Sequence, residues 1–433
     1  MRCYKFFLLA IVLCASKSVF TQKIIYSEPE REDGRRMNFE VIGKLASNFL
    51  IYKNIHNKSF IAIYNNNMVE VNKEELDYLP TEKIINIDFF PYQDFSYLIY
   101  EYQKKNIIYC NAVKIDEQGK KISDIIQLDT THIGFAGNNK IYSTISSEDK
   151  SKLMVFKINS RNRSKYMLTT LLFDDKLELQ KKSRLFINMD EHNDYLDEFN
   201  VDNGGDLVFA KYNRSSNETI NMVSMVLKSA LSDSLSVISI PLDKIYLDEL
   251  HIKVDNPNKR FFLTSFYYRQ KRGNIEGFYF YVLDKNTLMP VLQNSVVLSE
   301  ELRKEARGDA NSKMAFNDYF IRNIIIKRDG GFIINSEAYY TTSRYNSWNR
   351  WNYLYGMPYN SYDYYSSYSP YYSSLWWRNR YDNSQAVRYH ADNITILSFD
   401  KNGTLQWSDV IHKDQFDDES DDRVSYELAN TGN

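Results

Sequence analysis

The sequence contains few cysteines, glycines and prolines. Of its 433 residues only 3 are Cys, 15 are Gly and 8 are Pro. Scarce Gly and Pro argue against a collagen-like chain and a disordered Pro/Gly-rich chain. Cys3 and Cys14 fall in an N-terminal export segment, so the mature chain keeps Cys110 alone and has no intramolecular disulfide. The strand-like apolar pattern around Cys110 predicts a small buried side chain rather than a nucleophile.

A strong net charge is also absent. The 54 Lys and Arg residues nearly balance the 56 Asp and Glu residues, which leaves a formal charge of −2. A chain with this charge has no overall electrostatic field that would attract nucleic acid or acidic lipid, so we expect no nucleic-acid partner. After the N-terminal segment no apolar run is long enough for a transmembrane helix.

The N-terminal segment is typical of a secretory signal. Arg2 and Lys5 precede the apolar run 6–15, which is too short to span a bilayer. Small and β-branched residues near position 21 fit a cleavage site, so we assign a signal peptide to residues 1–22. Cleavage before Cys14, as in a lipoprotein, is the alternative, although a bulky leucine precedes this cysteine. The segment predicts export to the periplasm, the cell surface or the extracellular space.

Catalytic and metal-binding motifs are missing as well. The sequence has no Gly-x-Ser-x-Gly elbow, Walker loop or Cys-x-x-Cys pair. The acidic run 414–422 lacks the spacing and the glycine of a calcium loop. No two histidines have the spacing of metal ligands; they are His56, His132, His192, His251, His390 and His412. We therefore assign no catalytic residues, no metal site and no cofactor.

What the chain does contain is a repeat of roughly 45–55 residues. Each unit has two apolar strands joined by a short turn, a polar connection, and two more strands joined by a turn that begins with Asp. In the last complete unit, Asp329 begins the first turn and Asp400 begins the second, which ends at Gly403. The Asp side chain accepts a backbone hydrogen bond two residues on, and Asn or Gly takes the positive φ.

This repeat predicts an all-β fold, a β-propeller of about six to seven four-stranded antiparallel blades. Radial stacking of blades buries both faces of every sheet, whereas a sandwich or barrel, the alternative, does not demand a repeated four-strand period. We expect one propeller domain over residues 23–433. Its blades are predicted at about 39–75, 84–128, 132–188, 196–241, 248–298 and 318–413, and residues 423–433 start a further blade.

Two segments depart from the repeat. Residues 299–308 predict a short exposed helix with Ser299 as its N-cap and Gly308 as its stop. Near the end, the strand pattern of 424–428 predicts either the strand that closes the first blade or the start of a blade in a longer chain. We favour the second, because the other units place a strong strand just after this turn.

The last complete unit carries an insertion rich in Tyr and Trp at residues 343–383. Four of the five tryptophans of the protein lie in it. A loop of this length is usually functional or disordered, and rigid aromatic rings with Ser, Asn and Arg suit a binding loop for a sugar, a peptide or a protein. A low-complexity loop without function is the alternative. The candidate ligand-binding residues are Trp348, Trp351, Tyr353, Trp376, Trp377, Arg378 and Arg380.

The chain resembles the uncharacterised secreted β-propeller-like proteins of Bacteroidetes. Four features carry the resemblance: Gln22 after the signal, the strand pair around the turn at 329–331, the Tyr-rich insertion, and the hairpin 397–408. It implies export, a propeller, and a longer C-terminal part than this chain has. It brings no catalytic residues.

These observations lead to a functional hypothesis with one main alternative. We expect an exported, non-catalytic propeller that serves as a binding or scaffold module at the cell envelope and recognises a protein or glycan partner through residues 343–383. The alternative is a polysaccharide-active hydrolase or lyase with acidic residues and a His at the central mouth. An enzyme would require ionisable side chains gathered in one pocket with shifted pKa values.

Overall fold

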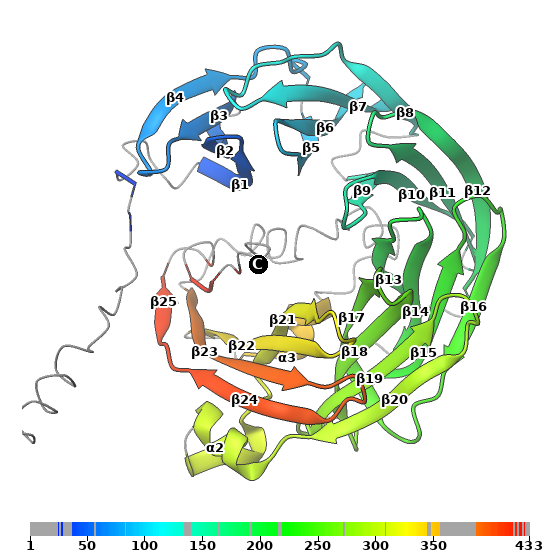
Figure 1. The fold of residues 1–433 in the computed structure, drawn as a ribbon, viewed down its shortest axis with the longest axis vertical. Helices are drawn as coiled ribbons and strands as arrows, with labels where there is room; N and C mark the ends of the chain where they lie inside the picture. The colour runs from blue at the N-terminus through cyan, green and yellow to red at the C-terminus, as the bar shows by residue number, and fades with distance from the viewer. Residues whose placement is uncertain are drawn as a thin grey trace, which may run out of the picture. The chain divides into compact units, whose positions relative to one another are not determined.

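A computed structural model shows an all-β chain that divides into two compact units, residues 1–134 and 135–433 (Figure 1). The predicted signal peptide, residues 1–22, lies outside the part of the chain that is described. The structure describes residues 25, 27–28, 37–55, 58–82, 84–133, 140–162, 164–189, 193–214, 219–271, 273–307, 309–343, 348–355, 387–418, 421, 424–426 and 428.

The first unit contains two four-stranded antiparallel sheets, each with its strands in chain order. Their strands are β1 (Met37–Leu45), β2 (Asn48–Ile55), β3 (Lys58–Tyr64) and β4 (Glu70–Glu75), then β5 (Ile84–Pro91), β6 (Phe95–Lys104), β7 (Ile107–Asp116) and β8 (Ile126–His132). The two sheets pack face to face, since Leu50 and Ile61 of the first share an apolar cluster with Leu98 and Val113 of the second. The Cys110 side chain on β7 is buried, as predicted.

The second unit contains four further meanders of four strands. The first two are β9 (Tyr142–Ser146), β10 (Lys152–Asn162), β11 (Lys165–Asp174) and β12 (Leu179–Asn188), then β13 (Asp194–Val201), β14 (Leu207–Arg214), β15 (Ile220–Lys228) and β16 (Leu235–Ile240). The last two are β17 (Tyr246–Asp255), β18 (Arg260–Tyr268), β19 (Gly277–Asp284) and β20 (Pro290–Val297), then β21 (Tyr319–Ile326), β22 (Phe332–Ser343), β23 (Val387–Phe399) and β24 (Leu405–Ile411). A short strand, β25 (Gln415–Asp417), also pairs with β23.

Three apolar clusters lie between consecutive meanders of this unit. One joins β9–β12 to β13–β15, the next joins β14–β16 to β17–β19, and the third joins β18–β20 to β21–β24. Burial on both faces explains why the middle strands read as continuous apolar runs, as in β18, where eight of nine residues are buried. The all-β class and the propeller-type unit of four antiparallel strands are confirmed.

The predicted count of six to seven blades is wrong. The described strands form five hydrogen-bonded sheets, two in the first unit and three in the second. The count falls because β15 pairs with β17 through Ile220 and Leu247 as well as with β16, which joins two meanders into one eight-stranded sheet. The strand expected near the C-terminus is not found at residues 424–426. There the chain bends, with a positive φ of 87° at Ser425.

The turns follow the predicted chemistry. Asp400 accepts hydrogen bonds from the backbone N–H groups of Asn402 and Thr404 at 2.9 and 2.8 Å. Gly403 then takes a positive φ of 73°. Asp202, in the turn between β13 and β14, accepts from Gly204 and Asp206 in the same way, at 2.8 and 2.9 Å.

The helix expected at residues 299–308 is present as α2 (Glu300–Arg307). The Ser299 hydroxyl accepts a hydrogen bond from the Leu302 N–H at 3.2 Å, which is the expected N-cap. One face is buried rather than exposed, because Leu302, Arg303 and Ala306 pack into the core. A 3-10 turn (Asp309–Met314) follows, and α3 (Arg350–Tyr355) begins inside the insertion. Among the described residues, no helix is long and apolar enough to cross a membrane.

Candidate functional site

The structure describes the first part of the Tyr/Trp-rich insertion, which we call the insertion root and define as residues 348–355. The root contains α3 and three of the predicted ligand-binding residues, Trp348, Trp351 and Tyr353. The other four, Trp376, Trp377, Arg378 and Arg380, lie outside the described residues. Their role in binding stays a prediction.

Aromatic side chains of the insertion root pack on the end of the last meander. Trp348 and Tyr353 join Phe320 of β21 and Tyr339 of β22 in one cluster. The ring of Tyr353 lies 4.6 Å from that of Phe320 and 4.9 Å from that of Tyr339. Trp351 packs instead against Tyr268 of β18, with ring centroids 5.7 Å apart. All three predicted residues are half-buried, so they fix the root and keep part of each ring accessible.

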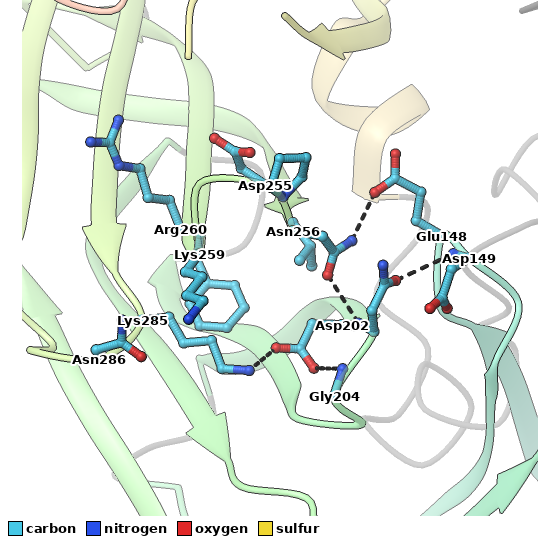
Figure 2. Close-up of a pocket in the computed structure, with 14 residues that line it drawn as sticks. Glu148, Asp149, Asp202, Gly204, Asp255, Asn256, Lys259, Arg260, Lys285 and Asn286 are labelled. Carbon is cyan, nitrogen blue, oxygen red and sulfur yellow. Dashed lines mark hydrogen bonds and ion pairs between the residues drawn. The ribbon is translucent and has the colours of Figure 1, made fainter. Parts of the chain in front are cut away.

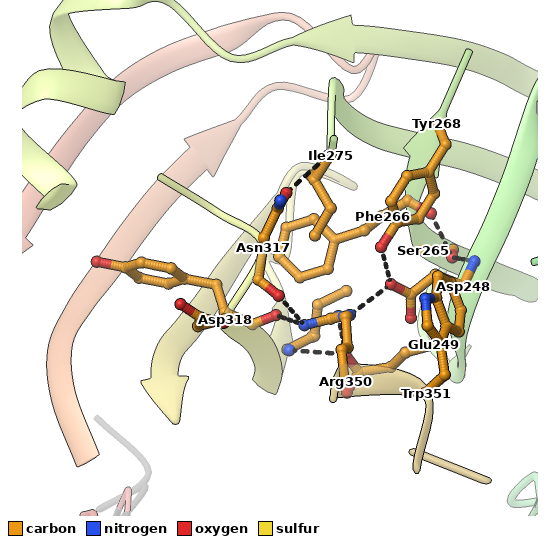
Figure 3. Close-up of polar contacts among 12 residues, drawn as sticks. Asp248, Glu249, Ser265, Phe266, Tyr268, Ile275, Asn317, Asp318, Arg350 and Trp351 are labelled. Atoms are coloured by element: carbon orange, nitrogen blue, oxygen red, sulfur yellow. Dashed lines mark hydrogen bonds and ion pairs between the residues drawn. The ribbon is translucent and has the colours of Figure 1, made fainter. Parts of the chain in front are cut away.

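A buried ion pair ties the insertion root to the neighbouring meander (Figure 3). The Arg350 Nε donates to Asp248 Oδ2 at 2.7 Å, and the Tyr268 hydroxyl donates to the same oxygen at 2.5 Å. The side chains of Arg350 and Asp248 are 7% and 0% exposed. Arg350 Nη1 also donates to the carbonyl oxygens of Asn317 and Tyr319. Burial raises the pKa of Asp248, and the adjacent guanidinium opposes this shift.

The first strands of three successive meanders carry β-bulges at polar residues. The pairing register shifts between Asp197 and Asn200 on β13, between Leu247 and Leu250 on β17, and between Ile321 and Asn323 on β21. A bulge re-aims the side chains of its extra residues. The residues within these bulges include Glu198, Asp248, Glu249 and Arg322. The bulges thus interrupt the regular alternation of side-chain direction along these strands and change the direction of four charged side chains.

Two of these carboxylates flank His251 of β17. His251 Nε2 lies 2.9 Å from Glu249 Oε1, and Nδ1 lies 3.7 Å from Glu198 Oε1. Glu198 Oε2 accepts a hydrogen bond from the Ile252 N–H at 2.8 Å. The site is connected to the insertion root, because Glu249 Oε2 lies 3.4 Å from Arg350 Nη2.

Burial and charge shift the pKa values of this group. Burial raises the pKa of Glu198 to about 7, although His251 opposes the shift. Burial alone would lower the pKa of His251, but the carboxylates of Glu198 and Glu249 outweigh it and raise the pKa to about 9. A carboxyl that titrates near neutral pH beside an imidazolium can donate and accept protons.

A second buried carboxylate, Glu337 of β22, contacts two cations and one hydroxyl from three segments of the chain. Its side chain is 0% exposed and lies 3.0 Å from Arg322 Nε and 2.7 Å from Lys413 Nζ. The Ser425 hydroxyl donates to Glu337 Oε2 at 2.5 Å. This contact and the packing of Val424 on the aromatic cluster of the root explain why the chain bends at 424–426 instead of forming a strand.

Sequence reasoning missed most of this polar network. The composition of the insertion indicates an aromatic loop around Arg350, and His251 is one of six scattered histidines. One signal was available: Glu198 and His251 each lie four residues before the Asp that begins the following turn, so they occupy equivalent positions in successive units. Among the described residues, no group of three or more His, Cys, Asp or Glu side chains is placed to hold a metal ion.

Protein stability should fall as the pH rises from about 5 to about 9. Folding raises the pKa of Glu198 from an ordinary 4.5 to about 7 and that of His251 from 6.5 to about 9. In these windows the folded state therefore binds more protons than the unfolded state, and each raised pKa contributes stability that is lost as the pH passes through it. Urea unfolding across this range should show a loss on the order of 2 kcal/mol for each group.

Single substitutions separate the two contributions. Glu198→Gln should flatten the decline below pH 7, and His251→Gln should flatten it between pH 6.5 and 9. His412→Gln, at an exposed position, is the matched control. An unchanged pH profile in the His251→Gln variant would contradict the assignment.

Comparisons with known proteins do not place the chain in a family. No protein-family model matches it, and a search of curated proteins found no match. Among solved structures, a mutant of Synechocystis apocarotenoid oxygenase is 8% identical with a TM-score of 0.36, over 65% of this chain and 64% of that one. A mutant of prolyl oligopeptidase B from Galerina marginata is 9% identical with a TM-score of 0.40, over 88% of this chain and 52% of that one. The chain thus spans between half and two thirds of these structures, and the likeness is too low to indicate a function.

Proposed function

We propose that this chain is an exported, non-catalytic propeller-type protein that acts as a binding or scaffold module at the cell envelope. Its recognition surface is the insertion 343–383, and its partner is a protein or a glycan. The observation that carries the proposal is the buried pair between Arg350 and Asp248, which fixes the start of the insertion to the sheet scaffold. The signal-like N-terminus and the resemblance to secreted Bacteroidetes proteins support export.

An anchored root favours binding for an energetic reason. Ordering a flexible loop on binding costs conformational entropy, and a loop that is already fixed at its base loses less. In the root, Arg350 holds one end of α3, while Trp348 and Tyr353 pack on the aromatic cluster below it. The partly accessible rings continue, in the sequence, into the Tyr- and Trp-rich residues that follow. Rigid aromatic anchors of this kind commonly supply most of the energy of a binding surface.

Deletion of residues 356–386 with a short Gly/Ser linker, leaving the root in place, tests the proposal. We expect the thermal unfolding midpoint to stay within about 3 °C, because the deletion leaves the described core intact. Binding to a glycan array and to immobilised envelope proteins should fall at least about tenfold for whichever ligand the intact protein captures.

A matched control removes an aromatic ring elsewhere on the surface. Trp407→Ala changes a side chain that is 49% exposed on β24, outside the insertion, and should leave binding unchanged. Retention of the same partner at the same affinity by the deletion variant would refute recognition through the insertion.

The group around His251 favours a second candidate, a polysaccharide-active hydrolase or lyase. Glu198 has a pKa raised to about 7, in the range that suits a general acid or base at neutral pH. Glu249, on the other side of the imidazole, would supply the second carboxylate that glycoside hydrolysis requires. The intact protein should release reducing ends or unsaturated products from a polysaccharide panel if it is such an enzyme. This activity should be lost in Glu198→Gln and kept in Glu305→Gln, at an exposed position of α2. If the intact protein releases no product from any polysaccharide of the panel, this candidate is excluded for the substrates tested.

A further inference from the structure

A cavity of about 650 Å³ lies where four turns of the second unit meet (Figure 2). The turns join β9 to β10, β13 to β14, β17 to β18, and β19 to β20. Its volume is within the range of small-molecule sites in proteins. The cavity is lined by a different set of residues from the insertion root and from the group around His251.

Side-chain hydrogen bonds between the turns hold the cavity in shape. The Asn256 amide donates to Glu148 Oε2 at 2.8 Å, and its carbonyl oxygen accepts from the Asn203 N–H at 2.9 Å. The Asn203 carbonyl oxygen in turn accepts from the Asp149 N–H at 3.2 Å. These bonds link residues 53 to 108 positions apart in the sequence. A ligand would therefore meet a largely pre-formed site.

Charge is separated along the lining of the cavity. Glu148 and Asp149 come from one turn, and Lys259 and Arg260 come from another (Figure 2). Lys285, between them, is neutralised by ion pairs with two aspartates of the β13–β14 turn. Among the described residues, Glu148, Asp149, Lys259 and Arg260 make no ion pair, although Arg260 lies close enough to Asp284 to lower the pKa of that carboxyl. Arg260 Nε is buried without a hydrogen-bond partner. Asp255, a further carboxylate of the lining, accepts hydrogen bonds from the Asn258 amide at 3.0 Å. The cavity thus has two carboxylates on one turn and two cations on another, and none of these four side chains is in an ion pair.

We propose that this cavity binds a short peptide with free termini. The N-terminal ammonium group of the peptide lies at Glu148 and Asp149, and its C-terminal carboxylate lies at Lys259 and Arg260. Opposite charges at separate points orient a zwitterionic ligand and reject ligands that lack either charge. Side-chain amides of the lining offer partners for the peptide groups between the termini.

The lining favours a peptide over a neutral sugar. A neutral sugar has no charge to pair with Glu148, Asp149, Lys259 or Arg260. Sugar rings also commonly stack on aromatic planes, and the one aromatic residue in the lining, Phe261, is 0% exposed. A peptide of about two to four residues matches the volume.

Titration with alanyl-glycyl-alanine, followed by calorimetry or by NMR shifts, tests the proposal. We expect saturable binding of the free tripeptide that is at least about tenfold tighter than that of its N-acetylated or C-amidated forms. The double variant Lys259→Gln with Arg260→Gln should lose the preference for the free carboxylate. Glu148→Gln with Asp149→Asn should lose the preference for the free amine.

Charge changes at the opposite end of the strands serve as controls. Glu305→Gln and Lys313→Gln, both exposed in the connection that contains α2, should bind the tripeptide as the intact protein does. Equal affinity for blocked and free peptides, or no saturable binding up to about 10 mM, would overturn the proposal. The proposal would also be overturned if the protein bound maltotriose and the same two double variants abolished that binding. Deletion of residues 356–386 should leave tripeptide binding intact, so a failure of this proposal is distinguishable from a failure of the proposed function.

Discussion

Replacement of Arg350 by methionine should destabilise the second unit by about 3–5 kcal/mol. The substitution keeps the aliphatic length of the side chain and leaves Asp248, which is 0% exposed, without its cation. A buried carboxylate without a counter-charge must either remain charged at high cost or take up a proton. The variant also removes the donors to the carbonyl oxygens of Asn317 and Tyr319.

Urea unfolding followed by tryptophan fluorescence checks this result. Arg388→Met is the matched control, because Arg388 and Asp418 form an ion pair at 2.6 Å with side chains 46% and 60% exposed, and we expect little change in its unfolding midpoint. The double variant Arg350→Met with Asp248→Asn should recover part of the lost stability, since it no longer buries a lone charge. If Arg350→Met were as stable as Arg388→Met, the insertion root would not be anchored by this pair.

Phe280→Ala should cost a similar amount, about 3–5 kcal/mol, for a different reason. Phe280 of β19 is 0% exposed, and its ring lies 4.8 Å from Phe332 and 4.9 Å from Phe399 across the interface to the last meander. Loss of the ring removes its transfer free energy and leaves a cavity that two rigid neighbouring sheets cannot close. The same denaturation experiment measures the loss.

Phe186→Ala is the matched control for this substitution. Phe186 lies on β12 of the same unit and is 50% exposed, so its truncation leaves no enclosed cavity. We expect its effect to be well below half of that of Phe280→Ala. Equal effects would mean that the interface between the last two meanders contributes little to stability.

The local features of the fold could be predicted from the sequence, whereas the grouping of the strands could not. Alternation and apolar runs indicate strands, and Asp followed by Gly at a fixed spacing indicates turns, because both depend on near neighbours. The eight-stranded sheet depends on one backbone pairing, between Ile220 and Leu247, which leaves no pattern in the sequence. The bend at Ser425 depends on Glu337, 88 positions earlier.

The candidate site was harder to predict than the fold for the same reason. The aromatic composition of the insertion pointed to a segment but not to its anchor, because Arg350 meets Asp248 across 102 positions of sequence. Bulges also hide functional positions, since they interrupt the alternation from which side-chain direction is inferred. Glu198 and His251 occupy equivalent positions in successive units, and this correspondence is the sequence feature that points to the group around His251.

The three apolar clusters of the second unit have a consequence for how such a chain changes during evolution. Each of these clusters is formed by side chains from two consecutive meanders, so each is completed by the next meander along the chain. Duplication of one meander would therefore add an interface of the same kind, and a chain could lengthen by whole units without redesign of the rest. The exposed positions of the turns lie outside these interfaces, so they could diversify in each copy while the buried faces stay constrained by their neighbours.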